Sequence, residues 1–288
     1  MSEPVKMTVA RLQRKKRSGE KITLLTAYDF PMAKFINMAG VDVVLVSDAV
    51  GTVGLGRPEA VSVSVEEMIY HTQAVARGAG TTMVLTTMPF GSYETVEQAV
   101  VTGVRLMKEG HADGIHMEGT AADAPKVKAL VHAGVPVMGH LGVTKQKIVR
   151  TGAIQIQGRT AASAASAVAD AVALANAGAF ALILECIPDR LGEIITRSLE
   201  IPTIGIGAGK GCDGQALVTQ DMLGMFKEMS PRFLKVYLDL TQIIVTGLTQ
   251  FRTEVEKGQF PGPEHTYTIE DEELGKLLSQ LQTKVIQQ

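Results

Sequence analysis

Eight short apolar runs recur along the chain, and longer amphipathic or alanine-rich stretches separate most of them. A short, nearly continuous apolar run is typical of a strand that is covered on both faces, as in a parallel sheet. We predict strands over residues 22–27, 41–47, 83–87, 114–118, 135–140, 180–185, 203–206 and 215–218. Helices are predicted between them over residues 31–39, 64–77, 95–109, 122–133, 161–177 and 189–198. This alternation predicts an α/β protein with a (β/α)8 barrel, and a doubly wound open sheet is the alternative.

The pattern changes after residue 218, where we predict helices over residues 220–226 and 231–257. A break that contains Pro and Gly, at 259–265, separates them from an acidic tail. Because one (β/α)8 barrel takes about 250 residues, we expect a single barrel domain with C-terminal helices over 1–258 and a tail over 259–288. The tail carries an amphipathic stripe at helical spacing, which predicts a docking helix at a subunit interface. The residues of this stripe are Leu274, Leu277, Leu278, Leu281 and Val285.

The charge balance excludes several classes of partner. The chain holds 28 Lys and Arg against 30 Asp and Glu, so no basic surface for nucleic acid or for a membrane is indicated. No apolar run approaches the ~18 residues that span a bilayer. The two cysteines, Cys186 and Cys212, form no Cys-x-x-Cys pair, which favours a reducing compartment. We therefore expect a cytoplasmic protein with a small-molecule partner.

Polar residues gather at the C-terminal ends of the predicted strands, where barrels of this kind place their functional groups. Each one has a plain structural explanation as well, because an Asp can cap a helix and a buried His can be hydrogen-bonded in the core. His116 and Glu118 lie two apart on one strand, so their side chains should share a face. Convergence at one end of the barrel predicts a pocket. The residues concerned are Asp29, Asp48, Thr87, His116, Glu118, His140 and Glu185.

Two of these carboxylates suggest a chemistry. Asp48 ends a strand, a suitable place for a carboxylate that holds a hard cation, and a cation there would polarise a carbonyl and stabilise an enolate. Glu185 closes another apolar strand and is placed to act as a general base. Together they favour proton abstraction next to a carbonyl group.

Several motifs resemble those of ketopantoate hydroxymethyltransferases, in order over about residues 7–266. They are LTAYD at 25–29, LVSD at 45–48, MPFGSY at 88–93, GHLG at 139–142, QGR at 157–159, LEC at 184–186, GIGAG at 205–209 and DGQ at 213–215. The resemblance implies a (β/α)8 barrel of the phosphoenolpyruvate/pyruvate superfamily type, assembled as a homo-oligomer, usually a decamer. It also implies a Mg²⁺-dependent transfer of a hydroxymethyl group from 5,10-methylenetetrahydrofolate to a branched 2-oxo acid, a step toward pantothenate.

The same resemblance assigns roles to single positions. It implies that Mg²⁺ is held at Asp48, Thr87 and Glu118, directly or through water. It makes Glu185 the proton acceptor, and His140 joins it as a catalytic candidate in the pocket. The positions implied to bind the 2-oxo acid are Asp48, Ala49, Thr87, His116 and Glu118.

The sequence departs from the family pattern at three of these positions. The family has Ser at the position of Ala49, Asp at that of Thr87 and Lys at that of His116. Loss of one acidic and one basic residue leaves the net charge of the pocket unchanged when His is neutral, which suggests a retuned pocket rather than an inactive one. Without the Asp, Mg²⁺ should bind more weakly, because Thr offers a neutral oxygen.

Three alternatives follow from these departures. His116 and His140 with a carboxylate from Asp48 or Glu118 could form a two-His-one-carboxylate set for Zn²⁺, Mn²⁺ or Fe²⁺. The chain could instead be a diverged member that runs another aldol-type carbon–carbon bond-forming, lyase or hydrolase reaction on a different carbonyl substrate. The third possibility is a barrel that binds a metabolite without catalysis.

Overall fold

The computed structural model describes residues 5–144, 155–225 and 231–285. The chain divides into two compact units, Met1–Leu238 and Asp239–Gln288, and each is described by itself. The domain organisation expected from the sequence, 1–258 and 259–288, stays a prediction.

The first unit is built on a closed barrel of parallel strands that pair in chain order from β1 to β8, and β8 pairs back onto β1. This finding confirms the predicted barrel and rules out the open sheet. The strands are β1 Ile22–Thr26, β2 Val43–Val46, β3 Met83–Thr87, β4 Gly114–Glu118, β5 Val137–Gly142, β6 Ala181–Glu185, β7 Thr203–Ile206 and β8 Gly214–Leu217.

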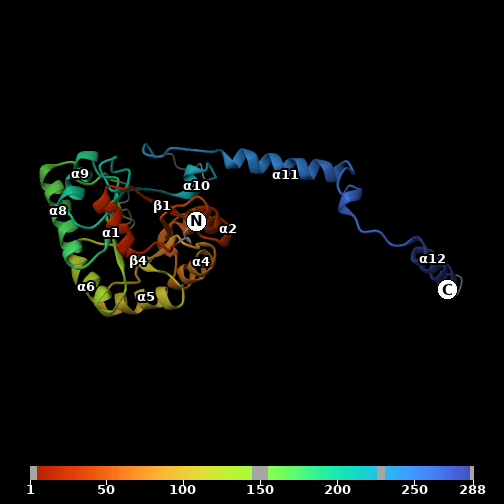
Figure 1. Ribbon diagram of the computed structural model, residues 1–288, viewed down its shortest axis with the longest axis horizontal. Helices are drawn as coiled ribbons and strands as arrows, with labels where there is room; N and C mark the ends of the chain where they lie inside the picture. Colours follow the sequence, from red (N-terminus) through yellow and green to blue (C-terminus); the bar gives the residue numbers. More distant parts are fainter. Residues whose placement is uncertain (1–4, 145–154, 226–230, 286–288) are drawn as a thin grey trace. The chain divides into compact units, whose positions relative to one another are not determined.

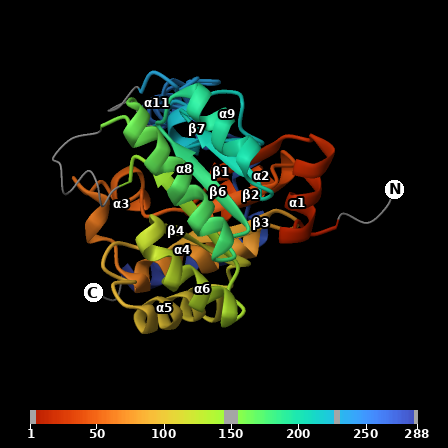
Figure 2. The same cartoon turned by 90° about the vertical axis from the view of Figure 1, so that its left-hand side faces the viewer.

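Helices follow the strands and pack around them (Figures 1 and 2). The six helices predicted between the strands are found close to their expected bounds. They are α2 Phe30–Met38, α4 Val65–Gly78, α5 Val96–Lys108, α6 Ala124–His132, α8 Ala161–Asn176 and α9 Asp189–Ser198. Short additional turns are α3 Val50–Val53, η1 Ala60–Ser62 and η2 Ala121–Asp123. Local capping explains several boundaries: Thr95, for example, accepts a hydrogen bond from the Gln98 amide at the start of α5.

The sequence did not predict the first helix, α1 Val9–Ser18. Most of its residues are basic or polar, so no apolar stripe predicted it. One apolar side chain, Leu12, is fully buried among strand residues inside the barrel. Lys15 Nζ lies 2.6 Å from Asp42 Oδ1, and Lys16 Nζ lies 2.9 Å from Asp213 Oδ2. Both aspartates directly precede strands, so α1 lies at the N-terminal end of the barrel, away from the ends that carry the predicted site.

The segment after β8 is less helical than predicted. Helix α10 covers only Thr219–Met222, and the expected helix over 231–257 is wrong for its first nine residues, because α11 is Leu240–Glu256. The Tyr237 amide instead donates to the Met222 carbonyl at 2.8 Å. Asp239 then caps α11 by accepting from the Gln242 amide at 3.3 Å. The backbone hydrogen bond of Tyr237 and the Asp239 cap thus set the start of α11. Apolar periodicity alone placed that start too early.

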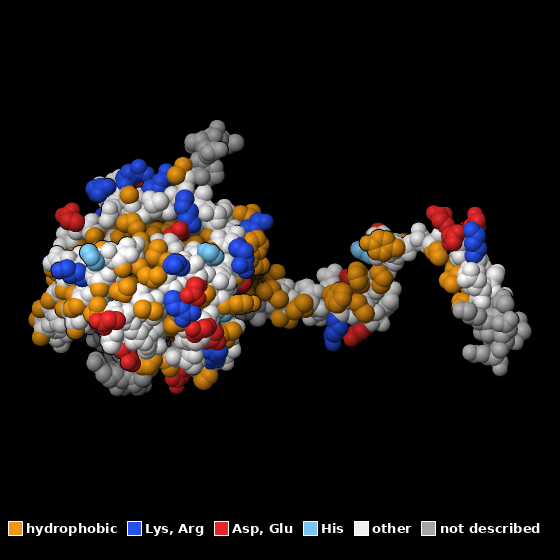
Figure 3. Space-filling view, turned by 90° about the horizontal axis from the view of Figure 1, so that it is seen from below, with side chains coloured by type: hydrophobic (Ala, Val, Ile, Leu, Met, Phe, Trp, Pro, Cys, Tyr) orange, Lys and Arg blue, Asp and Glu red, His pale blue; other side chains and the backbone are white. Residues whose placement is uncertain are grey.

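The second unit consists of α11, the 3₁₀ turn η3 Pro263–His265 and α12 Asp271–Val285. Apolar side chains gather on it (Figure 3), and several are about half exposed, among them Ile243, Leu248 and Phe251. The predicted tail helix is present as α12, while its docking at a subunit interface stays a prediction. Among the described residues, no helix has both the length and the apolar character that a membrane crossing requires.

Candidate functional site

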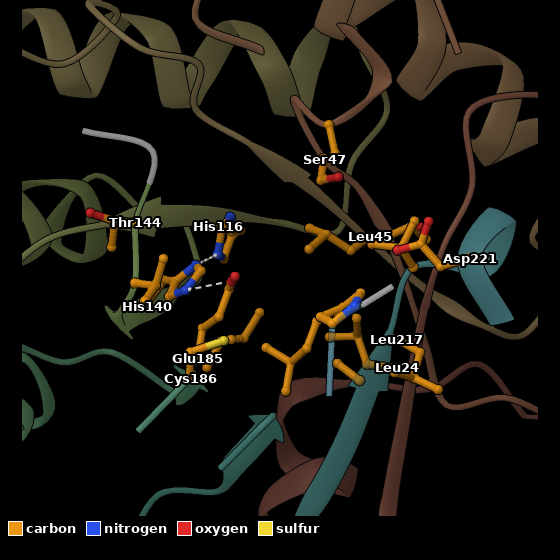
Figure 4. A pocket seen from close by; sticks show the side chains of 18 of the residues that line it. Leu24, Leu45, Ser47, His116, His140, Thr144, Glu185, Cys186, Leu217 and Asp221 are labelled. Carbon is orange, nitrogen blue, oxygen red and sulfur yellow. Dashed lines mark hydrogen bonds and ion pairs between the residues drawn. The ribbon is translucent and has the colours of Figure 1, made fainter. Parts of the chain in front are cut away.

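A cavity of about 310 Å³ opens at the C-terminal ends of the barrel strands. Its wall is mainly apolar, and a few polar groups converge on it, as in a small-molecule site (Figure 4). The polar lining residues are Thr26, Ser47, Thr52, His116, Glu118, His140, Thr144, Glu185 and Asp221, and apolar ones include Leu24, Leu45, Val53, Ile183, Ile206 and Leu217.

The predicted site residues divide into two groups. Ala49, His116, Glu118, His140 and Glu185 all line the cavity. The other group, Asp48, Thr87 and Asp29, does not. Asp48 and Thr87 are buried at 3% and 1% exposure, next to residues that do line it. Asp29 caps α2, where it accepts from the Met32 amide at 2.8 Å. The plain structural explanation therefore holds for Asp29.

A chain of contacts joins four of these side chains across four strands. Thr87 and His116 are register partners on β3 and β4, and Thr87 Oγ1 lies 2.9 Å from His116 Nδ1. The other nitrogen of that ring, Nε2, lies 3.0 Å from His140 Nδ1. His140 Nε2 in turn lies 3.2 Å from Glu185 Oε2. Figure 4 shows the last two contacts as dashed lines. Barrel register therefore connects a buried hydroxyl to the predicted base through two imidazole rings.

The last contact in this chain is short but poorly aligned. Although the two atoms are 3.2 Å apart, His140 Nε2 has no hydrogen-bond partner of good geometry among the described residues. The His140 side chain is only 7% exposed. A buried polar atom without a partner is costly in a folded protein unless a ligand completes it. The ring thus presents Nε2 to whatever occupies the cavity.

The backbone around Glu185 is held closely. The Val143 amide donates to the Glu185 carbonyl at 3.0 Å, and Gly142 is the register partner of Glu185 on β5. Gly142 has φ = 105°, and a Cβ there would overlap the Glu185 carbonyl oxygen. Only glycine permits both the positive φ and the close approach. Glycine at position 142 therefore lets β5 approach β6 closely enough to hold the backbone of Glu185, from which its carboxylate side chain extends.

Cys186, the residue after Glu185, also lines the cavity and has φ = 50°, an uncommon conformation for a residue with a Cβ. Burial, and then the negative charge of Glu185, raise the pKa of the Cys186 thiol to about 11. A thiol needs its ionised form to act as a nucleophile. At neutral pH this one stays protonated, so Cys186 serves as part of the wall and not as a nucleophile.

Sequence reasoning missed several residues of the site. Ser47 lines the cavity and its Oγ lies 3.0 Å from Tyr28 Oη. Pro231 and Phe233 line it from the non-helical segment after α10. Asp221 on α10 lies on the far side of the view in Figure 4 from His140. The position of Asp221 just after the last barrel strand could have indicated the site. It was not predicted as a site residue, because the sequence placed it inside a predicted helix over 220–226.

Burial raises the pKa of the Asp221 carboxyl from the usual 3.8 to about 6. Below the unfolded pKa the carboxyl is neutral in both states and costs nothing. Between about pH 4 and about pH 6 the unfolded chain ionises while the folded carboxyl stays protonated, so stability is lost over that window and the loss is complete above about pH 6. Asp221→Asn is expected to remove this loss. After discounting for solvent around a half-buried side chain, the gain at about pH 8 is about 1 kcal/mol, or about 2–4 °C in Tm.

The measurement is thermal unfolding of both proteins at about pH 4 and about pH 8, where only the higher pH should separate them. Glu200→Gln, an exposed substitution for which no ion pair is found among the described residues, is the control. Equal Tm differences at both pH values would contradict a buried, weakly acidic Asp221.

The described residues show no assembled ligand cluster at the magnesium site that the resemblance implies. Across residues 5–144, 155–225 and 231–285, no three His, Cys, Asp or Glu side chains are grouped so that they could hold a metal ion. Thr87 Oγ1 lies at hydrogen-bond distance from His116, and Asp48 does not line the cavity. For the same reason, the described residues do not form the two-His-one-carboxylate set that the sequence offered as an alternative. No step proposed below is therefore routed through a metal.

Comparisons with known proteins agree with the motifs. The profile of the ketopantoate hydroxymethyltransferase family matches residues 6–263. The chain belongs to this family. It is 47% identical to the 3-methyl-2-oxobutanoate hydroxymethyltransferase of Clostridium novyi, over 95% of this chain and 100% of that one. It is also 47% identical to the enzyme of the same name from Moorella thermoacetica, over 93% of this chain and 100% of that one.

The fold of this ketopantoate hydroxymethyltransferase family member is also similar to that of solved structures. Phosphoenolpyruvate phosphomutase from Streptomyces platensis has a TM-score of 0.61 at 13% identity, with 97% of both chains covered. Phosphonopyruvate hydrolase in complex with oxalate and Mg²⁺ has a TM-score of 0.57 at 14% identity, with 97% of this chain and 98% of that one covered. These likenesses agree with the closed (β/α)8 barrel of this chain.

Proposed function

We propose that this chain is a 3-methyl-2-oxobutanoate hydroxymethyltransferase, an enzyme that forms a carbon–carbon bond next to the carbonyl of a 2-oxo acid. The proposed one-carbon donor is 5,10-methylenetetrahydrofolate, and the product leads toward pantothenate. One observation carries the proposal: the Glu185 carboxylate and the unpartnered His140 Nε2 face one apolar cavity, 3.2 Å apart. A base and a hydrogen-bond donor side by side are what enolisation of a carbonyl compound requires.

Glu185 removes a proton from C3 of the 2-oxo acid. The electron pair of the broken C–H bond becomes the C2=C3 bond of the enolate, and the carbonyl oxygen takes the negative charge. His140 lies beside that oxygen. One water hydrolyses both C–N bonds of the donor's methylene group, which gives tetrahydrofolate and formaldehyde. C3 of the enolate then attacks the formaldehyde carbon while the C2 carbonyl reforms, and the formaldehyde oxygen takes a proton to become the hydroxyl of the product. The apolar wall, which includes Leu24, Leu45 and Ile183, excludes water that would protonate the enolate.

The predicted substrate-binding residues take different places in this proposal. Ala49, His116 and Glu118 line the cavity and contact the 2-oxo acid directly. Asp48 and Thr87 act from behind that wall, because both are buried outside the lining. Since Ala49 lacks the hydroxyl of the family's Ser, the carboxylate of the substrate loses a hydrogen bond there, worth roughly 1.5–3 kcal/mol when charged. We therefore expect a higher KM for the 2-oxo acid in this chain than in relatives that carry Ser.

The test of the function is product formation. Purified protein with 3-methyl-2-oxobutanoate and 5,10-methylenetetrahydrofolate should yield ketopantoate, detected by mass spectrometry. Two further 2-oxo acids, pyruvate and oxaloacetate, separate this reaction from that of a diverged relative that uses another carbonyl substrate. Folded protein that yields no ketopantoate, but enolises another acid of the panel, would replace the proposed substrate. If the protein enolises none of these acids, the remaining hypothesis is a barrel that binds a metabolite without catalysis. The relatives' names favour neither alternative.

Mg²⁺ stays a predicted cofactor, and its affinity is expected to be low with Thr87 in place of the family's Asp. Thr87→Asp should tighten Mg²⁺ binding by about tenfold, because a charged oxygen replaces a neutral one at a position that the resemblance assigns to the ion. Isothermal titration calorimetry with MgCl₂ and no substrate measures this effect. Thr87→Asn is the matched neutral control and should bind like the parent. Equal affinities of the Asp and Asn variants would show that position 87 is remote from any ion.

We further propose that the enzyme acts in the cytoplasm as a homo-oligomer, a decamer by resemblance, without nucleic-acid or membrane partners. The half-exposed apolar side chains of α11, such as Ile243 and Phe251, support burial against another copy. Sedimentation equilibrium of the full chain tests this assembly, and a monomer at micromolar concentration would overturn it.

A further inference from the structure

The two substituted positions of the pocket are in direct contact. Thr87 stands where the family has Asp and His116 where it has Lys, and Thr87 Oγ1 lies 2.9 Å from His116 Nδ1. A neutral imidazole has one nitrogen that donates and one that accepts, whereas a hydroxyl can do either. The direction of every hydrogen bond in the chain from Thr87 to Glu185 must therefore be set from one of its ends.

The Glu185 end sets that direction. A carboxylate, the form a base must have, only accepts hydrogen bonds, and Glu185 Oε2 lies 3.2 Å from His140 Nε2. If Nε2 were unprotonated, its lone pair would face a negative oxygen, so Nε2 carries the hydrogen. In a neutral His140 ring Nδ1 is then the acceptor, and the atom 3.0 Å away, His116 Nε2, is the donor. His116 Nδ1 must accept, and the Thr87 hydroxyl donates.

We propose that Thr87 and His116 are positioning residues that hold His140 as the Nε2–H tautomer, so that His140 donates a hydrogen bond to the carbonyl oxygen of the 2-oxo acid. This inference rests on the proposed function. When Glu185 removes the C3 proton, the C–H electron pair forms C2=C3 and the carbonyl π pair moves to oxygen. The enolate oxygen accepts the His140 hydrogen bond, and no proton leaves His140.

Two observations support this direction of donation. His140 Nε2 is buried and lacks an aligned partner among the described residues, so its hydrogen is available to a ligand. Thr87 is 1% exposed, so its hydroxyl is shielded from bulk solvent. The departures at positions 87 and 116 then form one joint change, in which a neutral donor and a neutral ring replace an acid and a base.

Thr87→Val removes the hydroxyl at nearly constant shape, and Thr87→Ser keeps it. Hydrogen–deuterium exchange at C3 of 3-methyl-2-oxobutanoate, followed by proton NMR without the one-carbon donor, reports the enolisation step. We expect Thr87→Val to lower kcat for exchange by about tenfold or more with KM changed less than about threefold, and Thr87→Ser to stay within about threefold of the parent. Thr87→Ala is the second variant if Val disturbs folding.

A spectroscopic reading is made on protein without substrate. In ¹⁵N-histidine-labelled parent protein, His140 Nδ1 should give the shift of an unprotonated ring nitrogen and Nε2 that of a protonated one. In Thr87→Val, part of His140 should change to the opposite tautomer. Parent-like tautomers and exchange rates in Thr87→Val would overturn the proposal, and so would Nδ1–H in the parent. If the parent enolises no 3-methyl-2-oxobutanoate, the proposed function fails, while the ring nitrogens still decide the direction of the hydrogen bonds.

Discussion

Replacing Glu185 with Gln is expected to lower the rate of deuterium exchange at C3 of 3-methyl-2-oxobutanoate by about 10²–10⁴-fold, the usual contribution of a general base. The amide has nearly the same shape but cannot take the proton. The amide oxygen can still face His140 Nε2, which lies 3.2 Å from Oε2 in the parent, so the cavity should keep its form. Substrate affinity should therefore change much less than kcat.

Proton NMR of the exchanging C3 position measures this effect, with circular dichroism as the check on folding. The matched control is Glu200→Gln, an exposed glutamate in the turn before β7, which should behave like the parent. Exchange at the parental rate in Glu185→Gln would remove Glu185 from the reaction, and with it the observation on which the proposed function depends.

Gly142→Ala is expected to destabilise the barrel by more than about 4 kcal/mol, a value that single substitutions seldom reach. Two costs combine at this residue. Its φ of 105° is unfavourable for a residue with a Cβ, and that Cβ would overlap the Glu185 carbonyl oxygen. Relief of the overlap would separate β5 from β6 where Val143 donates to the same carbonyl. Because this movement shifts Glu185, any folded fraction should also lose activity.

Gly134→Ala separates the two costs. Gly134 has φ = 84°, but a Cβ there would have nothing within 4 Å. It should lose only about 1–2 kcal/mol, from the backbone conformation alone. Urea unfolding of both variants gives the comparison. If Gly142→Ala were no less stable than Gly134→Ala, the close approach between Gly142 and Glu185 would not limit the choice of residue.

Strand-end residues show how far sequence reasoning reached in the site. Glu185 and His140 were expected in the pocket because each follows an apolar run, and both line the cavity. Asp48 follows such a run equally well, yet it is buried outside the lining. Asp221 does line the cavity, although it lies on a short helix that periodicity extended too far. Position at a strand end identifies the correct end of the barrel, but not which side chains reach its centre.

The sequence by itself determined the alternation of strands and helices, the barrel and the family, because these depend on local hydrophobic patterns and on contiguous motifs. Only the tertiary structure decided that Thr87, His116, His140 and Glu185 form one chain of contacts. The physical reason is that these residues come from four strands, β3, β4, β5 and β6. Their distances depend on strand register and barrel closure, and a linear sequence carries no local signal for either.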